Sequence, residues 1–249
     1  MIPTVSVDQM RAVDRLMVDE MGITLPQMME DAGRALAVQA RQMLGGDARG
    51  RRIVVLAGRG GNGGGGLAAA RRLSIWGADV TIVLGQDTRQ VRGVPAHQLA
   101  ILAKMGVTVR EPRPDGQGSL LPRQADLILD ALIGYSLRGA PRAPISDLIR
   151  AANAAGRSVL ALDLPSGLDG DTGRPAEPTM QAQATLALAL PKAGLRQPGA
   201  RTWVGTLYLA DISVPETVYR RLGLQVGPIF AQADIMRVDD VPETAVRGV

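Results

Sequence analysis

Residues 53–66 read IVVLAGRGGNGGGG, and this stretch decides the fold. Five apolar residues, typical of a buried strand, run into nine residues of which seven are glycine. The motif Gly58-x-Gly60-x-x-Gly63 follows the strand and precedes a helix that we expect at 67–76. Glycines let a backbone approach phosphate closely, and the N-terminus of a helix offers free N–H groups to an anion. The stretch therefore predicts a phosphate-binding turn in an α/β sheet.

Two other interpretations of the glycine-rich segment are weaker. A flexible connector would carry the entropic cost of seven glycines without a function to offset it. A Walker phosphate loop is excluded because no Gly-Lys-Ser/Thr follows the motif. An ordinary dinucleotide site would also place an acidic residue at the end of the second strand, where Asp87 is a poor candidate.

Two further apolar strands end in polar loops. Residues 127–129 run into Asp130 and then into a loop at 134–139, and residues 159–162 run into Asp163. In a parallel sheet such loops meet at the carboxyl edge, where ligands bind. Each carboxylate could cap a helix, bind a cation or act as acid and base. Together with the glycine turn, they predict a crevice for a phosphate-bearing ligand with a polar or cation-binding centre beside it.

The order of elements predicts an α/β fold, a Rossmann-like three-layer αβα sandwich with a mainly parallel sheet and two N-terminal helices. Residues 1–249 are expected to form one domain, with 238–249 as a loosely held tail. Apolar runs and helical periodicity give the ranges. Strands are expected at 53–57, 79–84, 107–109, 126–130, 158–163, 185–190 and 206–209, and helices at 6–20, 24–44, 67–76, 95–105, 144–155 and 216–222.

Composition excludes several classes of protein. The chain has no cysteine, which removes disulfides and thiolate sites, and its one histidine, His97, lies in a helix far from the polar loops. Aromatic residues make up 2%, and the basic residues behind the net charge of +4 are scattered, so we expect no nucleic-acid partner. We expect no signal peptide, and no apolar run reaches membrane-spanning length. We therefore expect a cytoplasmic protein without a membrane partner.

Six motifs together resemble the YjeF N-terminal domain family. The resemblance covers residues 8–237 and is most specific in the Asp-x-Pro-Ser-Gly-x-Asp segment that begins at Asp163. The motifs lie at 28–33, 57–67, 129–134, 163–173, 190–195 and 211–215.

The resemblance implies an isomerase, an NAD(P)H-hydrate epimerase that interconverts the R and S forms of hydrated NADH and NADPH (NADHX and NADPHX) for repair of the cofactor. It also implies a potassium ion, a functional partnership with a separate dehydratase, and a homodimer as one expected state. The implied potassium ligands are Asn62, Asp130 and Ser166. The implied substrate contacts are Gly61, Asn62, Gly63, Gly64, Gly65, Gly134, Tyr135, Ser136, Leu137, Arg138, Gly139, Ala140 and Asp163.

Epimerisation must break and remake the configuration at ring carbon six, and we expect Asp163 to be the general acid and base. The chain departs from the family loop Gly-x-Gly-Asn-Asn-Gly-Gly-Asp-Gly at two positions, with Gly61 in place of asparagine and Gly65 in place of aspartate. These losses motivate an alternative, a nucleotide-binding or scaffold protein of the same fold without turnover. An RNA-associated interaction domain is a weaker alternative, because no basic stripe is present.

Overall fold

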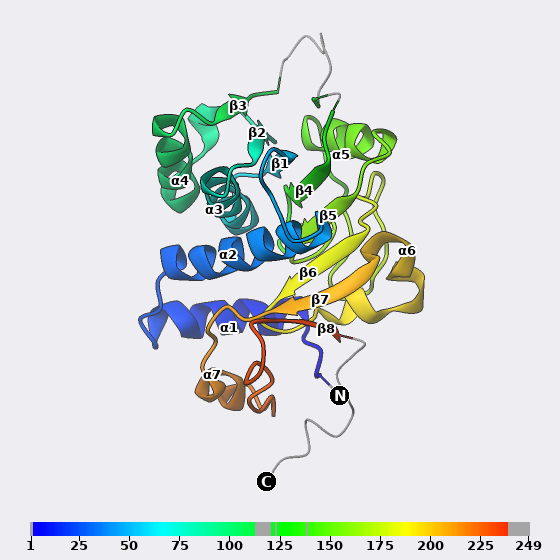
Figure 1. Ribbon diagram of the computed structural model, residues 1–249. Coiled ribbons are helices and arrows are strands. Elements are labelled where there is room, and N and C mark those ends of the chain that lie inside the picture. The colour runs from blue at the N-terminus through cyan, green and yellow to red at the C-terminus, as the bar shows by residue number, and fades with distance from the viewer. Residues whose placement is uncertain (1, 113–120, 123, 138, 239–249) are drawn as a thin grey trace.

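The computed structural model describes residues 2–112, 121–122, 124–137 and 139–238, and these form an α/β fold around one sheet (Figure 1). The strand order is β3-β2-β1-β4-β5-β6-β7-β8, and every neighbouring pair is parallel except β7 with β8. The mainly parallel sheet is thus confirmed. The strands are β1 Arg52–Ala57, β2 Asp79–Leu84, β3 Thr108–Arg110, β4 Leu127–Ala131, β5 Val159–Leu162, β6 Ala184–Leu188, β7 Thr206–Ala210 and β8 Ile235–Arg237.

Helices cover both faces of the sheet, as the alternation of apolar side chains requires. Ile53 and Val55 of β1 pack with α2, α3 and α4, whereas Val54 and Leu56 pack on the other face with α5. A third apolar cluster joins α1, α6 and α7 to β6 and β7. The helices are α1 Val7–Asp19, α2 Leu25–Met43, α3 Gly61–Ile75, α4 Gly93–Lys104, α5 Ile145–Ala154, α6 Arg201–Val204 and α7 Glu216–Arg221, with 3-10 turns at Thr88–Gln90, Ala193–Arg196 and Pro198–Ala200.

Capping boxes start both N-terminal helices. The Ser6 hydroxyl accepts from the Gln9 N–H at 3.1 Å, and the Gln9 side chain accepts from the Ser6 N–H at 2.8 Å. At α2, the Gln27 side chain accepts from the Thr24 N–H at 2.8 Å. The two predicted N-terminal helices are therefore confirmed, with starts fixed by local side-chain chemistry.

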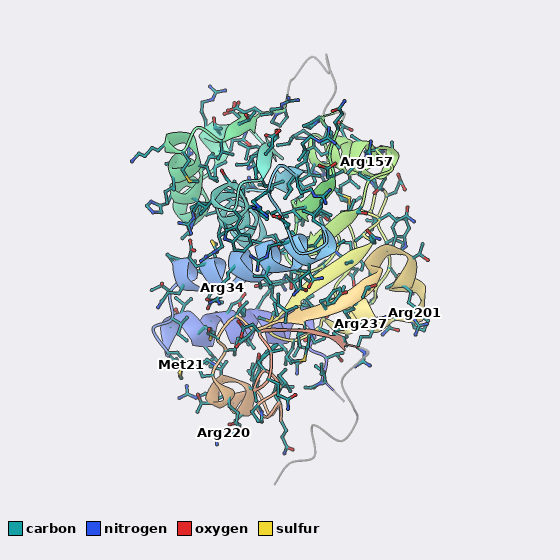
Figure 2. The ribbon with its side chains drawn as sticks, viewed as in Figure 1. Met21, Arg34, Arg157, Arg201, Arg220 and Arg237 are labelled. Carbon is teal, nitrogen blue, oxygen red and sulfur yellow. The ribbon has the colours of Figure 1, made fainter. Side chains whose placement is uncertain are left out.

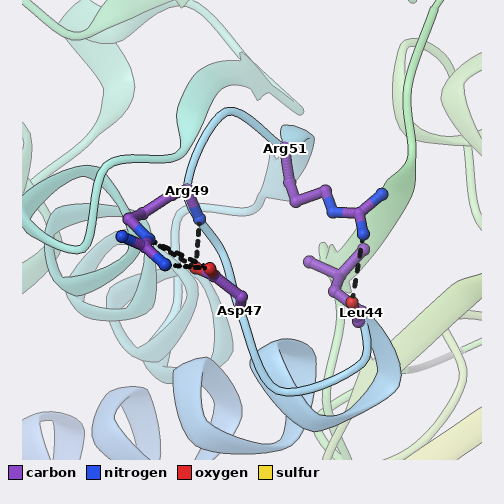
Figure 3. A network of polar contacts seen from close by, with 4 residues as sticks. All are labelled: Leu44, Asp47, Arg49 and Arg51. Atoms are coloured by element: carbon purple, nitrogen blue, oxygen red, sulfur yellow. Dashed lines mark hydrogen bonds and ion pairs between the residues drawn. The ribbon is translucent and has the colours of Figure 1, made fainter.

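A polar turn carries the chain from α2 into β1 (Figure 3). The Asp47 carboxylate accepts from the Arg49 backbone N–H at 2.9 Å and from the Arg49 guanidinium at 2.6 Å. The Arg51 guanidinium donates at 3.5 Å to the carbonyl of Leu44, the C-cap residue of α2. The turn lies at the start of β1, away from the strand's carboxyl end.

The predicted start of the helix after β1 was wrong. We expected Leu67, but α3 begins at Gly61, so the glycine run is mostly helix and only residues 58–60 form the turn. Close packing explains this. A Cβ on Gly66 would lie 2.5 Å from the Ala131 Cβ, and a Cβ on Gly33 of α2 would lie 2.8 Å from the Gly65 carbonyl oxygen. Here glycine permits two helices and a strand to touch.

Two short elements were missing from the prediction, β8 and α6. Most of the predicted tail lies outside the described residues, as do residues 113–120. Arginines lie at the periphery on several elements, and Figure 2 labels Arg34, Arg157, Arg201 and Arg220 among them. Among the helices described, none has the length and apolar composition to cross a membrane.

Candidate functional site

A cavity of about 730 Å³ opens at the carboxyl edge of the sheet. Its wall comes from the turns after β1, β2, β4 and β5, together with α1, α2 and the segment after β6. Seven of the predicted substrate-contact residues line it. They are Gly61, Asn62, Gly134, Tyr135, Ser136, Leu137 and Asp163.

The remaining predicted contacts fall in three groups. Gly63, Gly64 and Gly65 are buried in α3 beside the cavity rather than in its wall. Gly139 and Ala140 are exposed on the loop after β4 and are not part of the cavity wall. Arg138 lies outside the described residues.

The start of α3 is suited to an anion. Gly60 precedes the helix in an extended conformation and gives it no side-chain cap. The first N–H groups of a helix lack partners inside the helix, so they and the helix dipole favour negative charge at this end. Asn62 fixes the turn, because its side-chain amide donates to the Leu162 carbonyl of β5 at 3.0 Å. The start of α3 therefore offers N–H groups at the cavity wall, and phosphate as their ligand stays a prediction.

Packing explains the buried glycines of α3. A Cβ on Gly64 would lie 3.1 Å from the Met29 methyl group, and one on Gly65 would lie 2.9 Å from a Leu162 methyl group. By contrast, a Cβ on Gly61 would meet nothing closer than 3.8 Å. A longer side chain therefore fits at Gly61, whereas aspartate at Gly65 requires Leu162 to move.

Asp163 forms a buried ion pair with Lys192. The side chains of Asp163 and Lys192 are 5% and 1% exposed, and the Lys192 ammonium donates to Asp163 Oδ1. It also donates to the Leu188 carbonyl at 3.3 Å. Asp163 adopts a left-handed backbone conformation, with φ of 69°, which non-glycine residues seldom take. Asp163 Oδ2, which makes no hydrogen bond among the described residues, would lie 3.5 Å from a Cβ placed on Gly134, so it faces the loop after β4.

Sequence reasoning missed the role of Lys192. One signal was available, because Lys192 and Lys104 are the only lysines in the chain and Lys192 lies inside a recognised motif. A lone lysine after a strand is usually a surface residue, so its burial was not predictable from spacing.

Asp130 and Ser166 form a second buried polar centre. Asp130 Oδ2 accepts from the Ser166 N–H at 2.8 Å, and Oδ1 accepts from the Ser166 hydroxyl at 2.7 Å and the Leu132 N–H at 3.2 Å. Burial raises the pKa of Asp130 to about 6, although these hydrogen bonds oppose the rise. No cationic side chain pairs with Asp130 in the described part of the chain.

The structure brings the predicted potassium ligands to one region without joining all three. Asp130 contacts Ser166 directly, whereas the Asn62 amide lies beside Gly134, 3.3 Å from a Cβ placed there. Among the described residues, no hydrogen bond links Asn62 to either of the other two. The described residues also contain no cluster of three or more histidine, aspartate or glutamate side chains suited to a metal. A cation here would be bound by mixed oxygen donors.

A tyrosine and a second carboxylate line the end of the cavity beside the ion pair. The Tyr135 hydroxyl donates to Asp14 Oδ2 of α1, and both residues line the cavity. Lys192 Nζ lies 5.6 Å from the Tyr135 ring centroid, and the Arg11 guanidinium lies 6.0 Å from it. Burial raises the pKa of Asp14 and also that of Tyr135. Asp14 was not predicted.

The other end of the cavity is polar. Gln86, after β2, is 7% exposed, and its amide nitrogen has no hydrogen-bond partner in the described structure. Arg59 and Arg142 line the same end with exposed guanidinium groups. This end offers donors to an anionic or hydroxyl-bearing group. His97 is exposed on α4, as predicted for an ordinary helix residue.

Known proteins resemble this chain over most of its length. The family model for the YjeF-related protein N-terminus matches residues 25–194. An NAD(P)H-hydrate epimerase of Dehalogenimonas lykanthroporepellens is 43% identical over 90% of this chain and 87% of its own. A bifunctional NAD(P)H-hydrate repair enzyme of Hyperthermus butylicus is 38% identical over 78% of this chain, which spans 35% of that enzyme.

A solved structure shows the same fold. The crystal structure of the yeast protein ynu0 superposes with a TM-score of 0.80, covering 95% of this chain and 100% of the yeast chain at 23% identity. The Rossmann-like architecture predicted from the strand and helix order is therefore confirmed.

Proposed function

Because the chain belongs to the family of the YjeF-related protein N-terminus, we propose that it is an NAD(P)H-hydrate epimerase. The family resemblance indicated by the sequence motifs is confirmed by the matches over most of the chain. The observation that carries the proposal is the buried Asp163–Lys192 pair, which lies in the wall of the cavity that begins at the glycine turn. A nucleotide with its phosphates at that turn could extend toward this pair.

The proposed orientation follows from the two ends of the cavity. The N-terminus of α3, together with the exposed Arg59 and Arg142 of the cavity wall, suits the negatively charged diphosphate. The end of the cavity beside Tyr135 combines several apolar side chains with the ion pair, which suits the hydrated nicotinamide ring. The substrate is therefore NADHX or NADPHX.

Asp163 is the proposed proton-transferring group at ring carbon six. Loss of the hydroxyl group gives an iminium-like ring, and addition of water to the other face gives the epimer. Asp163 Oδ1 is held by Lys192, whereas Oδ2 makes no hydrogen bond among the described residues and faces Gly134. A carboxylate fixed in this way can exchange a proton with the hydroxyl or with water without moving.

A potassium ion is the proposed cofactor, with Asn62, Asp130 and Ser166 as its ligands. The donor set fits, because it supplies carboxylate, hydroxyl and amide oxygens, and Asp130 is fully buried without a cationic partner among the described residues. Such an ion would offset carboxylate and phosphate charge beside the glycine turn. The residues themselves tie the loop after β4 to the loop after β5 through the Asp130–Ser166 bonds.

Thermal unfolding tests the potassium proposal. Potassium should raise the melting temperature relative to a bulky organic cation at equal ionic strength, because a ligand that binds only the native state stabilises it by about 2.7 kcal/mol at a hundredfold excess over its dissociation constant. Asp130→Ala should abolish the difference, whereas Asp147→Ala, an exposed carboxylate on α5, should keep it. Equal melting temperatures in both salts for the wild-type protein would refute the site.

The remaining biological context is also proposed. A separate dehydratase would consume the S epimer, a role suggested by the repair enzyme from Hyperthermus butylicus, which is bifunctional and much longer than this chain. The cytoplasm as location and a homodimer as assembly stay predictions.

A nucleotide-binding protein without turnover is the second candidate. Gly61 and Gly65 replace an amide and a carboxylate of the family loop. Their consequences differ, because the space beside Gly61 is open whereas Gly65 packs on Leu162. The missing side chain at Gly61 therefore removes a possible ligand contact, whereas at Gly65 the space of the missing side chain is filled by Leu162.

A coupled assay separates the two candidates. R-NADHX alone is not a substrate for an S-specific dehydratase, so recovery of NADH above the spontaneous rate requires epimerisation by this protein. We expect that recovery to depend on the protein's concentration. Binding of NADP⁺ without any acceleration would instead support the second candidate.

A further inference from the structure

Two carboxylates reach the ring end of the cavity from opposite parts of the chain. Asp163 follows β5, whereas Asp14 lies on α1. Building on the proposed function, we propose that Asp14 is the second proton-transferring group of the epimerisation, acting on the ring face opposite to Asp163. The motifs that carry the family resemblance do not include Asp14.

The position of Asp14 on α1 supports this assignment. Met10, Val13 and Met17 form the buried face of α1, and Asp14 lies within that stripe at partial exposure. Met10 and Asp14 both line the cavity. An acidic residue on the apolar stripe of an amphipathic helix opposes burial, so its presence at the cavity wall calls for a reason other than packing.

The surroundings of Asp14 differ from those of Asp163. Asp163 is paired directly with Lys192. Asp14 has no cation bonded to it in the described structure and receives one hydrogen bond, from the Tyr135 hydroxyl to Oδ2. Its other charged neighbours act at longer range: Lys192 and Asp163, which line the same cavity, and Arg11, which is bonded to Asp8 and lies over the Tyr135 ring.

The surroundings of Asp14 favour its protonated form relative to an exposed aspartate. Burial raises the pKa of Asp14, while the Tyr135 hydrogen bond and Lys192 oppose the rise and Asp163 adds to it. Paired carboxyl groups in one site commonly divide the roles of acid and base when their environments differ. Asp14 Oδ1, which makes no hydrogen bond among the described residues, is free to carry the proton.

Epimerisation needs proton transfer on both faces of the ring. The protonated Asp14 gives its proton to the hydroxyl on ring carbon six; the C–O bond breaks, water leaves, and the lone pair of the ring nitrogen forms a C=N bond. A water molecule then adds to the opposite face and gives a proton to Asp163, which restores the neutral hydrate. The reverse reaction exchanges the two roles, and proton exchange with solvent resets both groups.

Steady-state kinetics of three variants test the proposal in the coupled assay. Asp14→Asn should lower kcat by about 10²–10⁴-fold, the usual contribution of a general acid or base. Asp19→Asn, an exposed carboxylate on the same helix, should leave kcat unchanged. NADP⁺ should still raise the melting temperature of Asp14→Asn, which shows that the variant is folded and binds nucleotide.

The pH dependence of kcat distinguishes proton transfer by Asp14 from a purely structural role, because a structural role would not shift the pH profile. Because Asp14 must be protonated to donate, kcat should fall as pH rises through its pKa. Tyr135→Phe removes the hydrogen bond that favours the ionised form of Asp14, so this limb should move to higher pH. The Tyr135→Phe result also decides the matter if Asp14→Asn does not fold.

The outcomes separate this inference from the proposed function. Suppose that the wild-type protein is active. A kcat of Asp14→Asn within twofold of the wild-type value, or a pH profile of kcat that Tyr135→Phe does not shift, would then overturn the role of Asp14 and leave the proposed epimerase activity intact. A wild-type protein without turnover overturns the proposed function and the role of Asp14 together.

Discussion

Removing the charge of Lys192 should destabilise this protein more than the loss of any exposed ion pair. Lys192 is buried, and its ammonium pairs with the buried Asp163. Lys192→Met keeps most of the side-chain volume but leaves the Asp163 carboxylate buried without a counter-charge. Breaking a buried pair in this way costs about 3–5 kcal/mol, since the desolvation of the remaining charge is no longer offset.

Urea and thermal unfolding measure this loss. For a chain of this size, each kcal/mol lowers the melting temperature by about 2–4 °C, so Lys192→Met should melt roughly 6–20 °C below the wild-type protein. The matched control is Arg150→Met, which removes a cation from an exposed pair with Asp147 and should cost about 1 kcal/mol or less.

The double variant Lys192→Met/Asp163→Asn isolates the pair. Neither charge remains in it, so most of the lost stability should return, and the two single effects should not add. A Lys192→Met protein within about 1 kcal/mol of wild type, or a double variant that loses the sum of both single effects, would refute the argument. Because Asp163→Asn alone strands a buried ammonium, its activity should be interpreted together with its stability.

Two further predictions concern packing and a surface pair. Gly33→Ala should cost about 1–3 kcal/mol of unfolding free energy, because its Cβ would lie 2.5 Å from the Ala68 Cβ. Gly61→Ala should instead raise the melting temperature slightly, since no atom lies closer than 3.8 Å to its Cβ. Thermal unfolding of the two variants measures both effects. Asp126→Asn should lose up to about 1 kcal/mol at pH 7. The Arg52 guanidinium lowers the pKa of Asp126 to about 2, so Asp126 stabilises the fold above its ordinary pKa of 3.8, and its advantage over the asparagine variant should disappear as pH falls from 4 to 2. A difference that persists at pH 2 would contradict this assignment.

The fold was predictable because its main signals are local. Continuous apolar runs such as those of β1, β4 and β5 indicate strands buried on both faces, and the structure places them at the centre of the sheet. The capping boxes at Ser6 and Thr24 set the starts of two helices within one residue. The three-residue β8 was not predictable, because only its pairing with β7 makes it a strand.

The site was predictable only in part. Asp130 and Asp163 end buried strands, so topology alone brought them to one edge. Lys192 and Asp14 lie in other segments of the chain than Asp130 and Asp163. The residues next to each of them in the sequence do not indicate that it is buried. Helical periodicity places Asp14 on the apolar stripe of α1, but its place in the cavity wall depends on how α1 packs there, which the sequence pattern does not give.

The glycine run of α3 has a consequence for the order of folding. Glycine in a helix is about 1 kcal/mol less favourable than alanine, so residues 63–66 together oppose helix formation by roughly 4 kcal/mol before any packing exists. The first turns of α3 can form only after β1, β4 and α2 are present to contact them. We therefore expect substitutions in these turns to change the unfolding rate and to leave the folding rate nearly unchanged, which corresponds to a kinetic φ-value near zero. The glycine turn would then take its shape late, once the sheet beneath it has formed.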